Sequence, residues 1–138
     1  MSTLGEIERW INETLSANAA IANAGNGVYH TLAIQKATAP YVVITPAGTA
    51  NVDKTLCGAV ASVRAVYDIR AVGKDTGFPR IALMEDAINV AVPIGRVTAA
   101  GTRPRFVVTI LSPIRRVTPG EGCEFYEAGG TYQFFVTP

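Results

Sequence analysis

The longest regular alternation of apolar and polar positions in the chain covers residues 59–72. Every second residue from 61 to 71 is apolar, whereas the positions between them include Arg64, Asp68 and Arg70. A period of two predicts a long β-strand with one buried face and one mixed face. The mixed face is typical of a strand that contacts another subunit, although a half-solvated sheet in a monomer would give the same pattern.

Two stretches carry the period of amphipathic helices. The first, residues 2–17, begins with capping-box spacing at Thr3 and Glu6, and residues 18–24 allow one more short helical turn. The second follows a turn at 73–77, where Asp75 or Thr76 is expected to cap the helix. The apolar stripes of the two helices are Leu4, Ile7, Ile11 and Leu15, and Ile81, Met84, Ala87, Ile88 and Ala91.

Further strands are predicted at 40–46, between two prolines, and at 105–117, with a bend near Pro113. A final hairpin joins residues 123–126 to 131–136 through a tight turn at 128–130. Residues 47–58 and 96–104 show no period and are expected to be irregular, the first as a long flexible loop. Together these elements predict one α+β domain over residues 1–138, with a mainly antiparallel sheet, two helices packed on one face, and long hairpin-type loops.

The composition argues against several classes of function. The 138 residues are 49% hydrophobic and carry a net charge of +1. A near-neutral chain disfavours a protein that grips nucleic acid electrostatically. No apolar run approaches the roughly 18 residues that span a bilayer, so no membrane contact is expected. The polar, acidic N-terminal segment is unlike a signal peptide, and Cys57 and Cys123 are therefore expected to be reduced thiols without a catalytic role.

The sequence contains none of the common motifs of catalytic or cofactor sites. It lacks GxSxG, HExxH and phosphate-loop patterns. His30 is the single histidine, and a lone histidine is more often a strand or surface residue than a metal ligand. Glu121, Glu124 and Glu127 cluster near the last hairpin, where they could hold a cation, but a solvated hairpin is the favoured interpretation. We therefore expect no enzyme activity, no cofactor and no metal site.

The order of the elements resembles that of one known family. A short N-terminal helix precedes Val28-Tyr29-His30 and the stretch Ala-Pro-Tyr-Val-Val-Ile-Thr at residues 39–45. A long loop, a long strand, a second helix and late strands with a glycine-rich turn follow. This succession is similar to that of the tail-terminator, or tail-completion, proteins of long-tailed, siphovirus-like bacteriophages. The local signature covers residues 28–45 only, and residues 96–104 have no counterpart in the pattern.

The resemblance implies a structural protein of the virion and not an enzyme. Members of the family form a six-fold homo-oligomeric ring that caps the tail tube, stops its polymerisation and presents a surface to the head-completion or connector protein. DNA passes through the lumen of the ring without specific binding. Such a protein is assembled in the host cytoplasm and resides at the head-tail junction.

Two candidate surfaces follow for this chain. Ring contacts are expected through the polar, mixed face of the long strand and through the edges of the sheet. The loop 47–58 is expected to order against the end of the tail tube or the adjacent subunit, because its polar residues cannot bury enough apolar area to order it alone. The residues concerned are Arg64, Asp68 and Arg70 for the ring, and Val52, Asp53, Lys54 and Leu56 for the tube. Two alternatives stay open: a head-completion or neck protein of the same joint, and a small cytosolic ligand-binding α+β domain.

Overall fold

The computed structural model describes residues 3–24, 27–30, 40–47, 51–54, 60–75, 77–92, 94–98 and 105–136. These residues form one seven-stranded sheet in the order β1-β2-β4-β7-β6-β5, with β3 beside β4. Only the pair β1 and β2 is parallel, so the predicted α+β class with a mainly antiparallel sheet is confirmed. The strands are β1 (Val28–His30), β2 (Tyr41–Pro46), β3 (Asn51–Lys54), β4 (Val60–Lys74), β5 (Gly95–Thr98), β6 (Arg105–Gly120) and β7 (Cys123–Val136).

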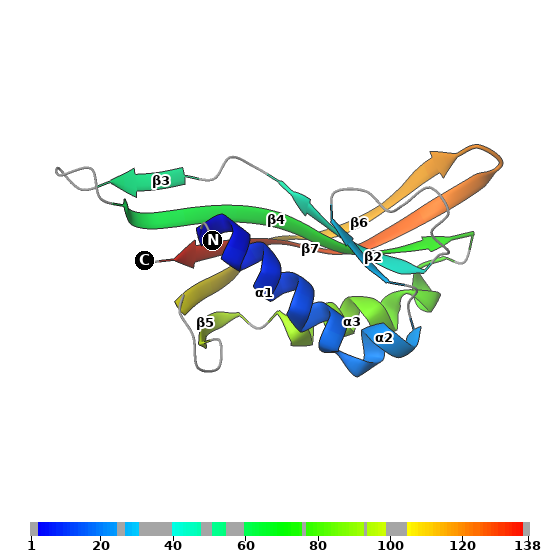
Figure 1. Ribbon diagram of the computed structural model, residues 1–138. Helices are drawn as coiled ribbons and strands as arrows, with labels where there is room; N and C mark the ends of the chain where they lie inside the picture. The colour runs from blue at the N-terminus through cyan, green and yellow to red at the C-terminus, as the bar shows by residue number, and fades with distance from the viewer. Residues whose placement is uncertain are drawn as a thin grey trace.

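The helices all lie on one face of this sheet (Figure 1). They are α1 (Thr3–Ala17), α2 (Ala19–Ala24), the 3-10 helix η1 (Phe78–Arg80) and α3 (Ala82–Ala91). Asn18 separates α1 from α2, because its side-chain oxygen accepts hydrogen bonds from the backbone N–H groups of Ala20 and Ile21. α1 and α3 correspond to the two predicted amphipathic helices, and α2 corresponds to the extra turn.

The core fills the space between these helices and the sheet. The even spacing of apolar residues in β4 has the predicted effect, since Ala65, Tyr67, Ile69 and Ala71 are all buried on the helix side. Two tyrosine hydroxyls in this core remain satisfied. Tyr67 donates to Glu8 at 3.0 Å and Tyr132 donates to Asn89 at 2.6 Å. Burial raises the pKa of Tyr132 to about 12, so it stays a neutral donor.

Strand β7 differs from the prediction. The Gly129-Gly130 pair was expected to form a turn, but Cys123–Val136 is one continuous strand, and the actual hairpin turn lies at Glu121 and Gly122. Gly122 has φ +68°, which suits glycine at that turn. Gly129 is needed for a different reason. A Cβ atom there would overlap the carbonyl oxygen of Ile69 and lie 2.7 Å from the Cα of Arg70, so β4 and β7 approach closely at this point.

Three other predictions need correction, two about irregular segments and one about the start of the second helix. The loop 47–58 was expected to be flexible throughout, but Asn51–Lys54 forms β3, which pairs with the start of β4. Within the stretch 96–104, residues up to Thr98 belong to β5, and 99–104 lie outside the described residues. The start of the second helix is also different, because η1 precedes α3 and the N-cap of α3 is Ile81 without a side-chain hydrogen bond. In β6 a bend was expected near Pro113, and the pairing with β7 is irregular between Ile110 and Ser112, next to that proline.

The close approach at Gly129 gives a prediction for stability. Gly129→Ala should lower the free energy of unfolding by about 3 kcal/mol, because the added methyl group meets backbone atoms that cannot move without separating β4 from β7. Gly130→Ala is the matched control. Its Cβ would meet only side-chain atoms of Tyr132 and Ile110 at 3.2 and 3.3 Å, so the loss should be about 1 kcal/mol or less. Urea unfolding followed by circular dichroism measures both, and equal losses would contradict this account.

Candidate functional site

The candidate site is the face of the sheet that carries no helix among the described elements (Figure 1). We call it the helix-free face. Strand register places polar side chains across it in rows, such as Thr45, Asp68, Thr131 and Ser112 on four adjacent strands. Its residues are Tyr41, Val43 and Thr45 of β2, Arg64, Val66, Asp68, Arg70 and Val72 of β4, Glu127, Gly129, Thr131, Gln133 and Phe135 of β7, and Ser112, Ile114, Arg116 and Thr118 of β6.

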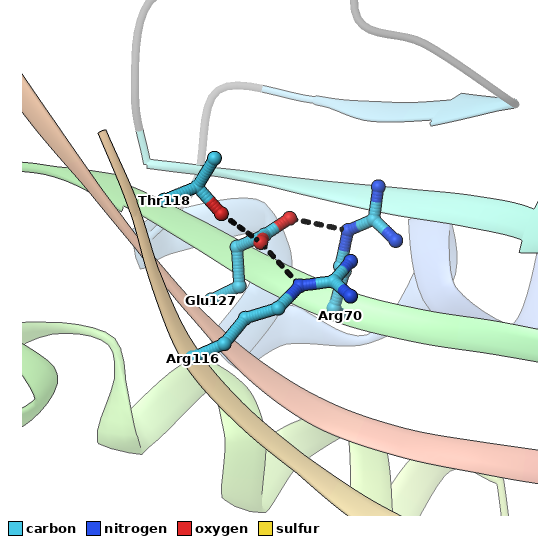
Figure 2. A network of polar contacts seen from close by, with 4 residues as sticks. All are labelled: Arg70, Arg116, Thr118 and Glu127. Carbon is cyan, nitrogen blue, oxygen red and sulfur yellow. Dashed lines mark hydrogen bonds and ion pairs between the residues drawn. The ribbon is translucent and has the colours of Figure 1, made fainter. Parts of the chain in front are cut away.

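A buried carboxylate organises the middle of this face (Figure 2). Glu127 is 8% exposed, and its Oε2 atom accepts hydrogen bonds from Arg116 Nε at 2.6 Å and Thr118 Oγ1 at 2.9 Å. The Nε–H of Arg70 lies 2.8 Å from Oε1, but it is not aimed at that oxygen, so this contact is an ion pair without a hydrogen bond. Three strands thus supply one group of residues, which we call the Glu127 network.

The electrostatics of the Glu127 network favour a charged carboxylate. Burial by itself would raise the pKa of Glu127. The hydrogen bonds from Arg116 and Thr118 and the charges of the two arginines outweigh burial, so the pKa lies below its ordinary value of 4.5. The hydrogen bond with Glu127 also raises the pKa of Arg116. Near neutral pH the network therefore contains one anion between two cations.

The structure brings the three predicted ring-contact residues onto the helix-free face, but it gives each of them an internal partner. Arg70 is engaged in the Glu127 network, with its side chain only 14% exposed. Asp68 accepts a hydrogen bond from Thr131 Oγ1 at 2.7 Å. Arg64 is exposed, with its guanidinium 5.4 Å from the centre of the Phe135 ring. Charge reversal at Arg70 would break the fold's own ion pair, so Arg64 is the better probe of a contact on this face.

The structure describes three of the four residues that were predicted to face the tail tube. Val52, Asp53 and Lys54 belong to β3, in register with β4, and this part of the loop is therefore a strand. Leu56 lies outside the described residues. In Figure 1, β3 and the start of β4 extend past the helices at one end of the sheet. Contact of this segment with a tail tube stays a prediction.

Ring contacts were also expected through the edges of the sheet, but the sequence did not show that one of these edges is formed by β6. β5 pairs only with residues 105–108 of β6, so residues 109–120 have no strand partner on the side away from β7 among the described residues. Apolar side chains stand exposed along this edge, including Leu111 at 53% and Val117 at 46%. A long unpaired edge with exposed apolar side chains is a site at which another strand can add.

The Glu127 network also corrects the interpretation of the acidic cluster. Glu121 and Glu124 are exposed as a solvated hairpin would have them, but Glu127 is buried and paired. The described residues contain no group of three or more His, Cys, Asp or Glu side chains that could hold a metal ion. Sequence spacing could not reveal the network, because residues 70, 116 and 127 meet only through the pairing of β4, β7 and β6.

The two cysteines and His30 were singled out in the sequence without an expected catalytic or metal-binding role. Cys123 is a half-buried free thiol beside the hairpin turn, and Cys57 lies outside the described residues. The backbone of His30 belongs to β1. None of the described helices is long and apolar enough to cross a membrane. A scan of the chain against models of known protein families found no match, and a search among curated proteins found none either.

The Glu127 network predicts a pH-dependent stability. Glu127→Gln should lower the free energy of unfolding by about 3 kcal/mol at pH 7, because it leaves the Arg70 charge buried without its counter-ion. The folded-state pKa of Glu127 is lowered, so the carboxylate contributes fully above about pH 4.5 and its contribution is lost as the pH falls through the folded pKa. The difference between the wild type and the variant should therefore narrow below that pH.

The control for this prediction is Glu121→Gln, which changes the same charge on the exposed hairpin turn. Its effect should stay within about 0.5 kcal/mol at every pH. Thermal unfolding between pH 3 and pH 8 supplies the data for all three proteins. A Glu127→Gln difference that is small at pH 7, or that stays constant down to pH 3, would show that the ion pairs do not hold the strands as described.

Proposed function

We propose that this protein is a phage tail terminator, which forms a homo-oligomeric ring on the end of the tail tube, stops its polymerisation and offers a surface to the head-completion protein. In this role the protein has no catalytic activity and needs no cofactor, and it resides in the virion at the head-tail junction. The resemblance of residues 28–45 and of the order of elements suggests the family. The fold supports the proposal through features that suit a subunit of an assembly.

The observation that carries the proposal is the unpaired edge of the sheet along β6. The helices all occupy one face, and residues 109–120 of β6 form a long lateral edge that no described strand covers. Monomeric proteins usually shorten, cover or charge such an edge or place proline in it, because it invites pairing with another chain. This edge carries Arg115 between Pro113 and Pro119, so only the short window between the prolines is open to another strand. The exposed Ile110, Leu111 and Val117 along the edge favour self-assembly over a monomeric ligand-binding domain.

The helix-free face supports a second contact in the same assembly. Arg64 is exposed there beside Phe135, in a region where Asp68, Thr131 and Gln133 are half-exposed. Mixed surfaces of this kind give orientation and specificity more than affinity. The chain's net charge of +1 suits a ring through which DNA passes, since a strongly basic lumen would retain the DNA.

The decisive experiment changes the segment proposed to meet the tail tube. Residues 51–55 are replaced by a Gly/Ser linker of equal length in the phage that encodes the protein, and the particles are examined by electron microscopy. We expect overlong tails, or tails detached from heads, because the ring no longer seats on the tube end.

Two controls keep this test interpretable. Glu121→Ser places a Gly-Ser-Gly sequence at the opposite, exposed hairpin turn and should leave the particles normal. Circular dichroism of the purified linker variant must show an intact fold, because β3 pairs with β4. Tails of normal length on intact heads, made with a folded linker variant, would contradict the proposed contact with the tube.

A further inference from the structure

The direction of the backbone groups along the free edge of β6 can be worked out from the register. Asp75 N–H donates to Glu124 C=O, so the even-numbered residues of β7 bond to β4 and the odd-numbered ones bond to β6. Glu127 opposes Arg116 in the β6 pairing. The even-numbered residues of β6 after the irregularity therefore bond to β7, and the odd-numbered residues from 113 to 119 direct their N–H and C=O groups outward.

The prolines of β6 agree with this assignment and limit what the edge can bind. Pro113 and Pro119 occupy odd-numbered positions, where a residue without an N–H group costs no bond to β7. Only Arg115 and Val117 between them retain outward N–H donors. A strand added to this edge therefore finds two donor residues within a short window closed by proline at each end.

The opposite edge of the sheet has a matching pair of groups. Val42 N–H donates to Gly27 C=O, and the parallel register continues from Val28 beside Val42. In a parallel ladder, the backbone N–H and C=O groups of Gly27 and Tyr29 are therefore directed toward β2. Those of Val28 and His30 are directed outward, away from β2. Among the described residues no strand pairs with that outer edge of β1. The free edge of β6 and the outer edge of β1 thus each carry two residues with outward backbone groups, two positions apart in the sequence.

The two edges also lie at the same level along the sheet. The register runs from Val28 through Val42, Ala71 and Ala128 to Arg115. β1 is antiparallel to β4, and β4 runs in the same direction as β6, so β1 is antiparallel to β6. A second copy in the same orientation, placed beside the first, would therefore bring its β1 antiparallel to the free edge of β6.

We propose that β6 of one copy pairs with β1 of the next, with Val117 opposite Val28 and Arg115 opposite His30 of the second copy. This inference rests on the proposed ring and names its subunit contact. Each of the two pairs exchanges two backbone hydrogen bonds, and the register requires a shift of two residues, about 7 Å, along the strands. The sheet becomes continuous between copies, and all helices stay on one side of it.

A symmetric alternative is disfavoured by charge. Two copies could also join β6 to β6 around a two-fold axis, and the outward groups of Arg115 and Val117 would then pair with each other. That arrangement centres on residue 116 and places Arg116 directly opposite the same residue of the second copy. Like charges directly opposite are destabilising, whereas the contact with β1 is head-to-tail and can close into a ring.

Disulfide cross-linking tests the contact directly. Val28→Cys and Val117→Cys are combined in one chain, in which Cys57 and Cys123 are changed to Ser, and the protein is oxidised at high concentration and at tail-tube ends. Hydrogen-bonded antiparallel pairs have Cα atoms about 5.5 Å apart, which a disulfide can bridge. We expect a ladder of covalent multimers that ends at the ring. Val28→Cys with Thr109→Cys is the control, since Thr109 lies about 26 Å further along the same edge and should give no ladder.

A second pair of variants separates the backbone from the side chain. Val117→Pro removes one outward N–H group without removing a bond to β7, whereas Val117→Ala retains it. The proline variant should lose at least tenfold in ring formation while keeping the wild-type circular dichroism, and the alanine variant should assemble within about threefold of the wild type. Equal assembly by the proline variant and the wild type overturns the proposed pairing.

The outcomes distinguish this contact from the proposed function. A covalent dimer without higher species means a two-fold contact and overturns the inference. Rings that form without cross-linking mean that another surface joins the subunits, which overturns the inference and leaves the terminator proposal standing. A complete ladder from a protein whose linker variant makes normal tails supports the contact and contradicts the proposed function.

Discussion

The long antiparallel pair of β4 and β7 is the constraint on which the rest of the structure depends. Their register runs without interruption from Val63 opposite Val136 to Lys74 opposite Phe125. It fixes which residues of both strands face the helices, because a slip of one residue would turn every side chain to the other face. The close approach at Gly129 sets the two backbones at a spacing that no other residue would allow.

The Glu127 network depends on the same register, and it lies on the helix-free face of the sheet. Two arginines and a threonine reach one buried carboxylate only when β4, β7 and β6 pair as they do. Burying charges costs desolvation, so such a network adds little net stability compared with apolar residues of similar size. Its value lies in specificity, since any other register would leave Arg70 or Glu127 buried without a partner. The helix-free face is thus held by an interaction that penalises mispairing.

The sequence was sufficient for the features that depend on local period. The alternation in β4 and the apolar stripes of α1 and α3 predicted the buried faces and the α+β class. It was insufficient where distant segments decide the outcome. The Gly129-Gly130 pair has the composition of a turn, but it lies within a strand because β4 passes too close for a side chain. Polar Asn51–Lys54 forms β3 because β4 extends beyond its pairing with β2 and leaves an edge open on that side.

The candidate site was predictable in part for the same reason. The alternation placed Arg64, Asp68 and Arg70 on one face, as observed, but it could not show that Arg70 and Asp68 have partners on β7. The free edge of β6 becomes visible only when the pairing is known, since β5 covers four of its residues and β7 occupies the other side. The pairing also shows that Pro113 and Pro119 stand where no hydrogen bond to β7 is lost and where the free edge lacks an N–H donor, which their sequence positions alone did not indicate.

The central claim is that this sheet is completed by a second copy along its edges. Residue-resolved hydrogen exchange of the free and the assembled protein tests it most directly. The account predicts that the amides of Arg115 and Val117, and of Val28 and His30, gain protection on assembly, while the even-numbered residues of β6 from 112 to 120, already bonded to β7, change little. New protection confined to α3 or to the helix-free face, with these edge amides unchanged, would contradict it.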